Sequence, residues 1–253
     1  MITNDNLMAD TLRIGNDTDN IVQCILDTVR AAQLLTRHSM FVIDFNERAL
    51  LWRSERMMFL GERSEADASC LNPYWSHTTD EVRHRLMNMS GQLCVVVGEH
   101  FTKGRDGLVC IMDYPISVDG HEVYVRQKTI IMLIPDSRVK EAVFGGLRII
   151  SLNTVRESTA DRMGCLLVMP DGDVYRYDME AGAFDDTPLR IELTDREKDI
   201  LLRSRTGSSY DELAQSMFIS RNTVKRHLSN IFKKTDTHTI MQAINACEDL
   251  NLI

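Results

Sequence analysis

The sequence contains no run of eighteen apolar residues, and its amino end lacks a basic segment followed by an apolar one. A helix that spans a bilayer needs about 20 mostly apolar residues, and a secretory signal needs that basic-then-apolar order. The sequence therefore predicts neither a membrane segment nor an export signal, and we expect a cytoplasmic protein.

The residue patterns that usually mark enzymes and metal proteins are missing too. Six cysteines are scattered along the chain without a Cys-x-x-Cys pair, which favours reduced, buried thiols over a zinc site or a disulfide framework. There is no Ser-His-Asp or Cys-His set, no carboxylate pair and no glycine-rich phosphate loop. The sequence thus predicts no catalytic residues, no metal and no cofactor.

Basic residues are fewer than acidic ones, 29 against 37, and the formal net charge is −8. The charge is unevenly distributed, because from residue 190 onward ten basic residues accompany nine acidic ones. Residues 221–234 contain five basic residues and no acidic one. A positive footprint confined to one segment is typical of a protein that touches nucleic acid with a single helix.

That segment has the periodicity of an amphipathic helix with one buried and one basic side. The buried side is formed by Val224, Leu228, Ile231 and Phe232. The opposite side carries Lys225, Arg226, Ser229 and Lys233. Ser220 precedes the run and is placed to cap its first turn, so that the amino end could sit against a phosphate.

Further short helices are predicted on both sides of it. Thr194-x-x-Glu197 and Ser209-x-x-Glu212 have the spacing of capping boxes, and Gly207 can end the first helix in a left-handed conformation. The second helix presents as its apolar side Leu213, Ala214, Met217 and Phe218. A fourth helix is indicated by Ile240, Ala243, Ile244, Cys247 and Leu250. The tight connection at 218–220 makes the arrangement a helix-turn-helix.

These residues also resemble the LuxR/FixJ-type DNA-binding domain of bacterial transcription factors. The pattern of that family appears as Leu193-Thr194-Asp195-Arg196-Glu197, then Glu212-Leu213-Ala214, then Ile219-Ser220 and the run from Asn222 to Ile231. Several matched blocks at matched spacings make it specific.

The resemblance implies double-stranded DNA as the partner and assigns roles to particular side chains. Lys225, Arg226 and Ser229 would face the base edges, while Thr223 and Lys233 would contact the phosphate backbone. Asn222 completes the expected DNA-binding set. Members of this family commonly dimerise through the fourth helix, here about residues 239–250.

Upstream, residues 1–36 are predicted to form a polar, frayed segment to about Asp19 and then an amphipathic helix. The apolar stripe of that helix comprises Ile21, Val22, Ile25, Leu26, Val29 and Leu34. Such a stripe must be buried, either against the next domain or against the same helix of a second subunit. We therefore expect a homodimer, held by this stripe or by the fourth helix near the carboxyl end.

Residues 37–160 are predicted to form an α+β domain. Hairpins are expected at 40–45 with 49–52 and at 108–118 with 122–134, and a strand at 147–155. Small helices and a longer one at 79–99 lie between the hairpins. This order, an antiparallel sheet with helices on one face, resembles a PAS sensor domain over about residues 37–157.

The stretch at 161–188 reads as a hairpin, whose sheet the sequence does not identify, followed by an acidic linker that ends at Pro188. The all-α, four-helix LuxR-type domain then occupies 189–253. The predicted architecture is thus a PAS-like domain followed by a helix-turn-helix domain.

The role of the PAS-like domain has more than one interpretation. It could sense an unidentified small-molecule signal, or it could be a ligand-free interaction module that serves only to dimerise the chain. His84 and His100 lie where some haem-binding PAS domains place an iron ligand, but exposed or hydrogen-bonded histidines are commoner. A small-molecule enzyme with a basic tail is disfavoured because catalytic residues are missing. The sequence therefore predicts a sequence-specific DNA-binding transcription regulator.

Overall fold

The computed structural model describes residues 4–60, 71–101, 108–136 and 146–253. The chain divides into two compact units, Met1–Pro188 and Leu189–Ile253. Each unit has its own hydrophobic core.

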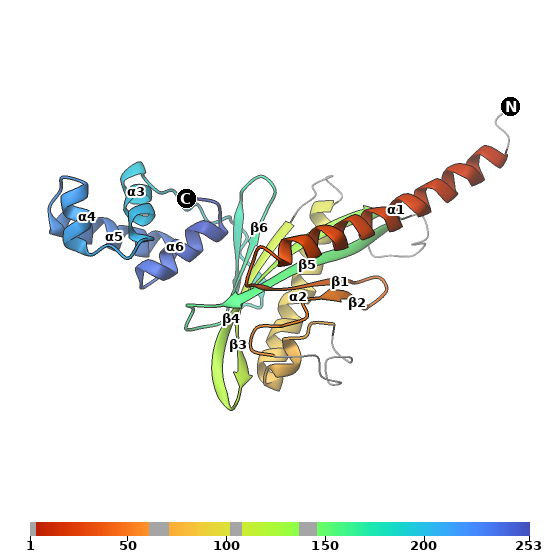
Figure 1. The fold of residues 1–253 in the computed structure, drawn as a ribbon, viewed down its shortest axis with the longest axis horizontal. Coiled ribbons are helices and arrows are strands. Elements are labelled where there is room, and N and C mark those ends of the chain that lie inside the picture. The colour runs from red at the N-terminus through yellow and green to blue at the C-terminus, as the bar shows by residue number, and fades with distance from the viewer. Residues whose placement is uncertain (1–3, 61–70, 102–107, 137–145) are drawn as a thin grey trace. The chain divides into compact units, whose positions relative to one another are not determined.

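The first unit is built on an eight-stranded antiparallel sheet with the order β2-β1-β5-β4-β3-β6-β7-β8 (Figure 1). Its strands are β1 (Ser39–Asp44), β2 (Ala49–Arg53), β3 (Leu108–Val118), β4 (His121–Pro135), β5 (Leu147–Glu157), β6 (Gly164–Val168), β7 (Val174–Asp178) and β8 (Ala183–Phe184). The sheet and the helix inserted between β2 and β3 confirm the predicted α+β, PAS-like fold.

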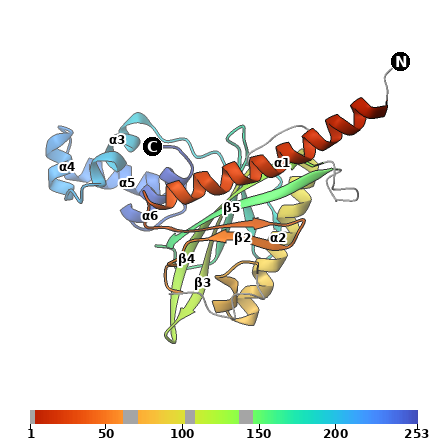
Figure 2. The ribbon, with the colours of Figure 1, turned by 45° about the vertical axis from the view of Figure 1, so that its right-hand side comes forward.

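Two helices pack on opposite faces of this sheet (Figures 1 and 2). The helix α2 (Asp80–Phe101) buries Leu86, Met89, Leu93 and Val97 in a core with one face of the strands. The helix α1 (Asn4–Gln33) buries Val22 and Val29 against the other face. The expectation that helices cover one face of the sheet is therefore corrected, because the stripe of α1 shields the second face. A short 3-10 helix, η2 (Trp75–His77), precedes α2.

The amino-terminal segment also differs from expectation, because α1 is helical from Asn4 onward and is not confined to residues after Asp19. Polar contacts hold this helix to the sheet just before its apolar stripe. The Thr18 hydroxyl donates to the Pro135 carbonyl at 2.8 Å, and Asp19 pairs with Arg148 at 3.4 Å. Arg148 also pairs with the buried Asp44 at 2.6 Å. A search for apolar periodicity cannot detect anchors of this kind.

The turn between β3 and β4 is the one predicted from Asp119-Gly120. Both residues have positive φ, 49° and 78°, and they connect strands whose pairing extends to Val118 opposite His121. Two consecutive positive φ values define a type I′ turn, whose twist matches that of the flanking strands.

The hairpin whose sheet the sequence left open extends the PAS-like sheet. Strand β6 pairs with β3, from Val109 opposite Val168 to Asp113 opposite Gly164, and β7 pairs with β6. Strand β8 pairs with β7 within the stretch expected to be a linker. Residues 164–184 therefore belong to the first unit.

Only part of the cysteine prediction holds among the described residues. Cys110, Cys165 and Cys247 are buried free thiols, but Cys24 and Cys94 are exposed. The Sγ atoms of Cys110 and Cys165 lie 3.6 Å apart in the core. The hydrogen bond with Cys110, together with burial, raises the pKa of Cys165 well above its ordinary value, so Cys165 remains a neutral thiol. Cys70 lies outside the described residues.

The second unit consists of α3 (Asp195–Ser204), α4 (Tyr210–Ser216), α5 (Arg221–Thr235) and α6 (Ile240–Asp249). Both predicted capping boxes are present, at the starts of α3 and α4, and a third begins α6. Gly207 has a φ of 79°, as expected after α3. The fully buried residues include Ile200, Leu201, Leu213, Val224 and Ile231. The predicted all-α, four-helix unit is therefore confirmed.

Phe218 was expected on the apolar side of α4, and this prediction is wrong. The helix ends at Ser216, and Phe218 has a φ of 56° and is 96% exposed. A left-handed backbone at this position turns the chain sharply into α5, and the turn directs the phenyl ring into solvent.

A buried carboxylate joins the first and third helices of this unit. Glu197 is 2% exposed. Its Oε2 accepts from the Thr194 backbone N–H at 2.8 Å and from Lys234 Nζ at 2.7 Å. Burial raises the pKa of Glu197, but the bonds from Lys234 and Thr194 together outweigh it, so the pKa is lowered. The ionised form is therefore the one that the fold stabilises.

We expect Glu197→Gln to destabilise the second unit by about 1 to 3 kcal/mol at neutral pH, because the charged hydrogen bond to Lys234 is lost. A carboxylate with a lowered folded-state pKa contributes fully above its unfolded pKa, about 4.3, and loses this contribution as the pH falls through its folded pKa. The stability gap between wild type and variant should therefore close below about pH 4. Thermal unfolding of fragment 188–253 across this pH range measures the gap, and a constant gap would contradict the assignment.

Candidate nucleic-acid interface

The helix α5 is divided lengthwise into a buried and an exposed side. Val224, Leu228 and Ile231 are buried, in the core formed with the other three helices. The residues predicted to bind DNA lie at helical spacing on the other side, and those exposed to solvent are Asn222, Lys225, Arg226, Ser229 and Lys233. Thr223, the sixth, is half-buried. The structure therefore brings the predicted set together along one helix.

Ion pairs separate the basic residues of α5 into two groups. Lys234 pairs with Glu197 at 2.7 Å, and Arg221 lies 3.4 Å from Asp211. Lys225, Arg226 and Lys233 form no ion pair with any residue that the structure describes. A cation without a protein partner is available to neutralise a phosphate or to donate to a base. These three available cations are among the residues predicted from the sequence to contact DNA.

The start of α5 is fixed by hydroxyl groups. Ser220 Oγ accepts from the Thr223 backbone N–H at 3.1 Å, and the two hydroxyl oxygens lie 2.8 Å apart. The first turn contains no acidic residue, whereas α3 and α4 each have two. Since a helix amino end carries partial positive charge, this end favours an anion more than its neighbours do.

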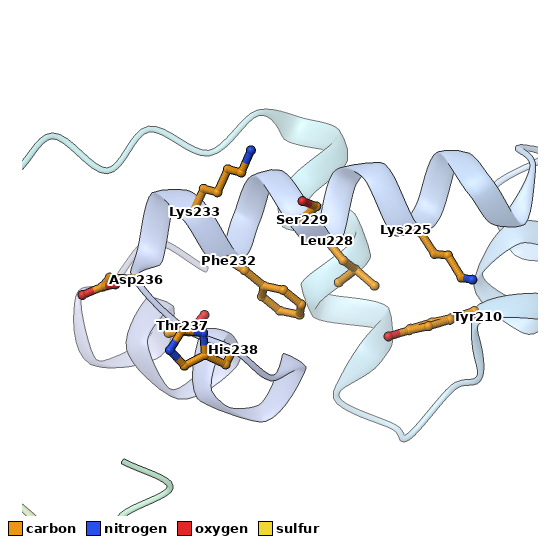
Figure 3. A pocket seen from close by; sticks show the side chains of 9 residues that line it. All are labelled: Tyr210, Lys225, Leu228, Ser229, Phe232, Lys233, Asp236, Thr237 and His238. Carbon is orange, nitrogen blue, oxygen red and sulfur yellow. The ribbon is translucent and has the colours of Figure 1, made fainter. Parts of the chain in front are cut away.

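Sequence reasoning missed two side chains beside this face. Tyr210, the first residue of α4, and His238, between α5 and α6, line a hollow together with Lys225, Ser229 and Lys233 (Figure 3). Neither residue belongs to the periodic pattern of α5. A left-handed φ of 52° at Asp236 turns the chain after α5, and this turn places His238 beside the helix. The helical periodicity of the sequence does not predict such a turn.

The two stripes expected to hold a dimer differ in how far they are buried within their own unit. On α1, Val22 and Val29 are buried, Ile25 and Leu26 are half-buried, and Ile21 and Leu34 are 44% and 87% exposed. On α6, Ala243, Ile244 and Cys247 are buried, and Met241 is 53% exposed. The apolar area that remains for a second subunit is therefore smaller than the sequence suggested.

Other candidate sites receive little support. His84 is exposed, with its ring Nδ1 3.4 Å from Asn88 Nδ2, and the side chain of His100 lies outside the described residues. Within the described ranges, no group of three or more His, Cys, Asp or Glu side chains is arranged to hold a metal ion. None of the described helices is long and apolar enough to cross a bilayer.

Residues 192–247 match the family model described as "Bacterial regulatory proteins, luxR family". The second unit is a luxR-family helix-turn-helix domain. The match extends from just before the α3 capping box to the buried Cys247 of α6, so it includes every predicted DNA-binding residue.

Two curated relatives match part of the chain. The "Probable csgAB operon transcriptional regulatory protein" of Salmonella typhimurium is 39% identical over 90 residues, which cover 36% of this chain and 38% of that protein. The "CsgBAC operon transcriptional regulatory protein" of Escherichia coli is 40% identical over 88 residues, which cover 35% and 37%. The chain thus spans less than two fifths of the length of these relatives.

Among solved structures, one described as "VqmA bound to DPO" is 14% identical, covers 88% of this chain and 86% of that chain, and has a TM-score of 0.30. One of a Vibrio cholerae VqmA dimer without target DNA is 14% identical, covers 87% and 86%, and has a TM-score of 0.24. Likeness at these TM-scores is too weak to bear on fold or function.

Proposed function

We propose that this chain is a sequence-specific DNA-binding transcription regulator that acts in the bacterial cytoplasm. The observation that carries the proposal is the exposed face of α5, where Lys225, Arg226 and Lys233 have no ion-pair partner within the described part of the chain. This face belongs to a luxR-family domain. A helix of this type enters the major groove with one face while its apolar face stays in the protein core.

The predicted DNA-binding residues divide into those that read sequence and those that hold the DNA backbone. Lys225, Arg226 and Ser229 are assigned to base edges, and Asn222 lies at the helix start beside them. Thr223 and Lys233 are assigned to phosphates. Contacts to base edges discriminate between sequences, whereas phosphate contacts set register and add affinity for any duplex.

Replacement of one residue from each group should give different results. Arg226→Ala should cost about 1 to 3 kcal/mol on the preferred duplex and relax the preference at one base position. Lys233→Ala should weaken binding to all duplexes alike and reduce the salt dependence by about one unit. Affinity measured on a selected and on a random duplex, at several salt concentrations, checks both. Equal losses on both duplexes for both variants would refute the base assignment.

We further propose that the working unit is a homodimer. One recognition helix with three available cations reaches too few base pairs and phosphates for tight binding at physiological salt. The surface that supports pairing best is the exposed side of α1, where Ile21, Cys24 and Ile25 line an apolar hollow with Met132 and Leu152 of the sheet. Symmetric pairing would favour an inverted repeat with half-site centres about 10 base pairs apart.

Two matched substitutions test which helix holds the pair. Ile21→Glu on α1 should make the full chain monomeric, while Met241→Glu on α6 should leave it dimeric, because both positions are exposed and neither change removes core packing. Light scattering of the variants, and of fragment 188–253, measures the outcome. A full chain that is monomeric and still protects a single half-site would refute the homodimer, and a dimeric fragment would place the contact on the luxR-family domain.

The first unit would control how the two DNA-binding domains are presented. A signal that binds one arrangement better than another shifts the population towards it and thereby changes operator affinity without any chemistry. This is the role proposed for the PAS-like unit, with an unidentified small molecule as the signal.

One observation favours the alternative, a ligand-free interaction module. The polar side chains buried between the sheet and α2 bond to one another. Gln127 Oε1 accepts from Asn72 at 2.9 Å and from Tyr114 at 2.7 Å. Its Nε2 donates to Thr129 at 3.0 Å and to Asn153 at 2.9 Å. A network that satisfies its own donors and acceptors needs no ligand to complete it.

Native mass spectrometry of the purified chain separates these two roles. If the unit is a sensor, we expect a retained small molecule that is lost when Gln127→Leu removes the centre of the polar network. If it is an interaction module, the spectrum should show dimer of the mass of two bare chains. A retained molecule that survives Gln127→Leu would show that the network is not its site.

A further inference from the structure

The hollow beside α5 is lined from three separate elements of the luxR-family domain (Figure 3). The side chain of Lys225 extends towards Tyr210 at the start of α4, and His238 approaches from beyond the end of α5. Leu228 and Phe232 form an apolar floor. Three of the predicted DNA-binding residues, Lys225, Ser229 and Lys233, therefore share one concave surface with two residues to which no function has been assigned.

The backbone at the two added residues is held in place by local structure. Tyr210 is the first residue of α4 and lies inside the capping box formed by Ser209 and Glu212. The backbone N–H of Thr237 donates to the Phe232 carbonyl at 3.0 Å, and that of His238 donates to Gln242 Oε1 at 2.9 Å. These bonds fix the backbone at His238 close to the end of α5 before any partner arrives, so little conformational entropy remains to be lost on binding.

Their polar atoms remain available. Within the residues that the structure describes, no hydrogen bond is made by the Tyr210 hydroxyl or by the His238 ring. Lys225 and Lys233, in the same hollow, lack ion-pair partners in the described chain. Beside its apolar floor, this concave surface offers a hydroxyl, an imidazole and two ammonium groups as hydrogen-bond donors, and Asp236 is the one acidic residue among the described residues that line it. Its chemical complement is an anion with several acceptor oxygens.

We propose that this hollow holds the phosphodiester backbone of one DNA strand, with Tyr210 and His238 as phosphate-binding residues. The proposal rests on the DNA-binding function proposed above and extends it to two further elements of the domain. Half to two thirds of protein–DNA hydrogen bonds go to phosphate and sugar. The phosphate oxygens accept from the Tyr210 hydroxyl and from a His238 ring N–H, while Lys233, already assigned to phosphate, neutralises their charge.

One residue in the hollow opposes the bound anion. The Asp236 side chain lines the same surface and carries a negative charge, which a phosphate would meet at close range. Removing that charge must therefore affect DNA binding in the opposite direction from removing a donor. Asparagine tolerates the left-handed φ of 52° at this position, so Asp236→Asn changes the charge without a change of backbone.

The test measures affinity of the full-length protein for a duplex selected by wild type from a random pool, and for an unrelated duplex. Tyr210→Phe and His238→Ala should each weaken both complexes by about 2- to 10-fold, the range for loss of one hydrogen bond. Asp236→Asn should strengthen both. Equal effects on the two duplexes are the sign of a phosphate contact. His121→Ala, at the exposed start of β4 in the first unit, is the matched control and should leave affinity unchanged.

The outcomes separate this proposal from the function on which it rests. A wild-type protein that binds neither duplex would overturn both. Wild-type binding that Tyr210→Phe and His238→Ala leave unchanged, with Arg226→Ala still impaired, would overturn the phosphate site alone. The same would follow if Asp236→Asn and His238→Ala shifted affinity in the same direction, because that result indicates a common effect on folding. Unchanged melting temperatures with opposite shifts in affinity would support the site.

Discussion

The burial of one side of α5 is the constraint on which the second unit depends. Val224, Leu228 and Ile231 are enclosed by the other three helices, and this fixes the rotation of α5 about its own axis. Once the rotation is fixed, the side chains at 225, 226, 229 and 233 must face outward. The core thus determines which residues a partner can reach, and a substitution within it would misplace the face as well as weaken the fold.

Glu197 also determines which basic residues of α5 remain available to a partner. Because its buried carboxylate pairs with Lys234, one lysine of the adjacent pair at 233 and 234 is committed to holding α3 against α5. Its neighbour remains free of ion pairs within the described residues. Lys233 and Lys234 are adjacent and chemically identical, yet they have different roles. The difference arises because Glu197, part of the α3 capping box, pairs with Lys234 alone in the part of the chain that the structure describes.

In the first unit, the strands β1, β4 and β5 bury both of their faces, one under α1 and the other towards α2. The two faces differ in chemistry. The core under α1 is formed by apolar side chains beside the Arg148–Asp44 ion pair, whereas the face towards α2 includes the polar network centred on Gln127. A contact with a partner at α1 and a polar ligand near α2 would therefore act on opposite sides of the same strands.

What the sequence predicted well was specified by residues close together in the chain. Capping boxes, the Asp119-Gly120 turn and the periodicity of α5 each involve a few neighbouring positions, so their physics can be read locally. The pairing of β6 with β3 joins residues more than fifty positions apart, and no short pattern specifies it. The contact that anchors α1 at Asp19 involves Arg148, which is more than one hundred residues away. His238 was missed because a single left-handed residue, Asp236, carries it into place.

The two edge strands of the described sheet limit the pairing of strands between molecules. One outer strand, β2, has five residues, and the other, β8, has two. The pairing of β1 with β2 is also interrupted by an irregularity between Val42 and Ile43. Short and irregular edges offer few unpaired amide and carbonyl groups to a foreign strand. The outer strands β2 and β8 therefore give this sheet little tendency to continue from one molecule into the next.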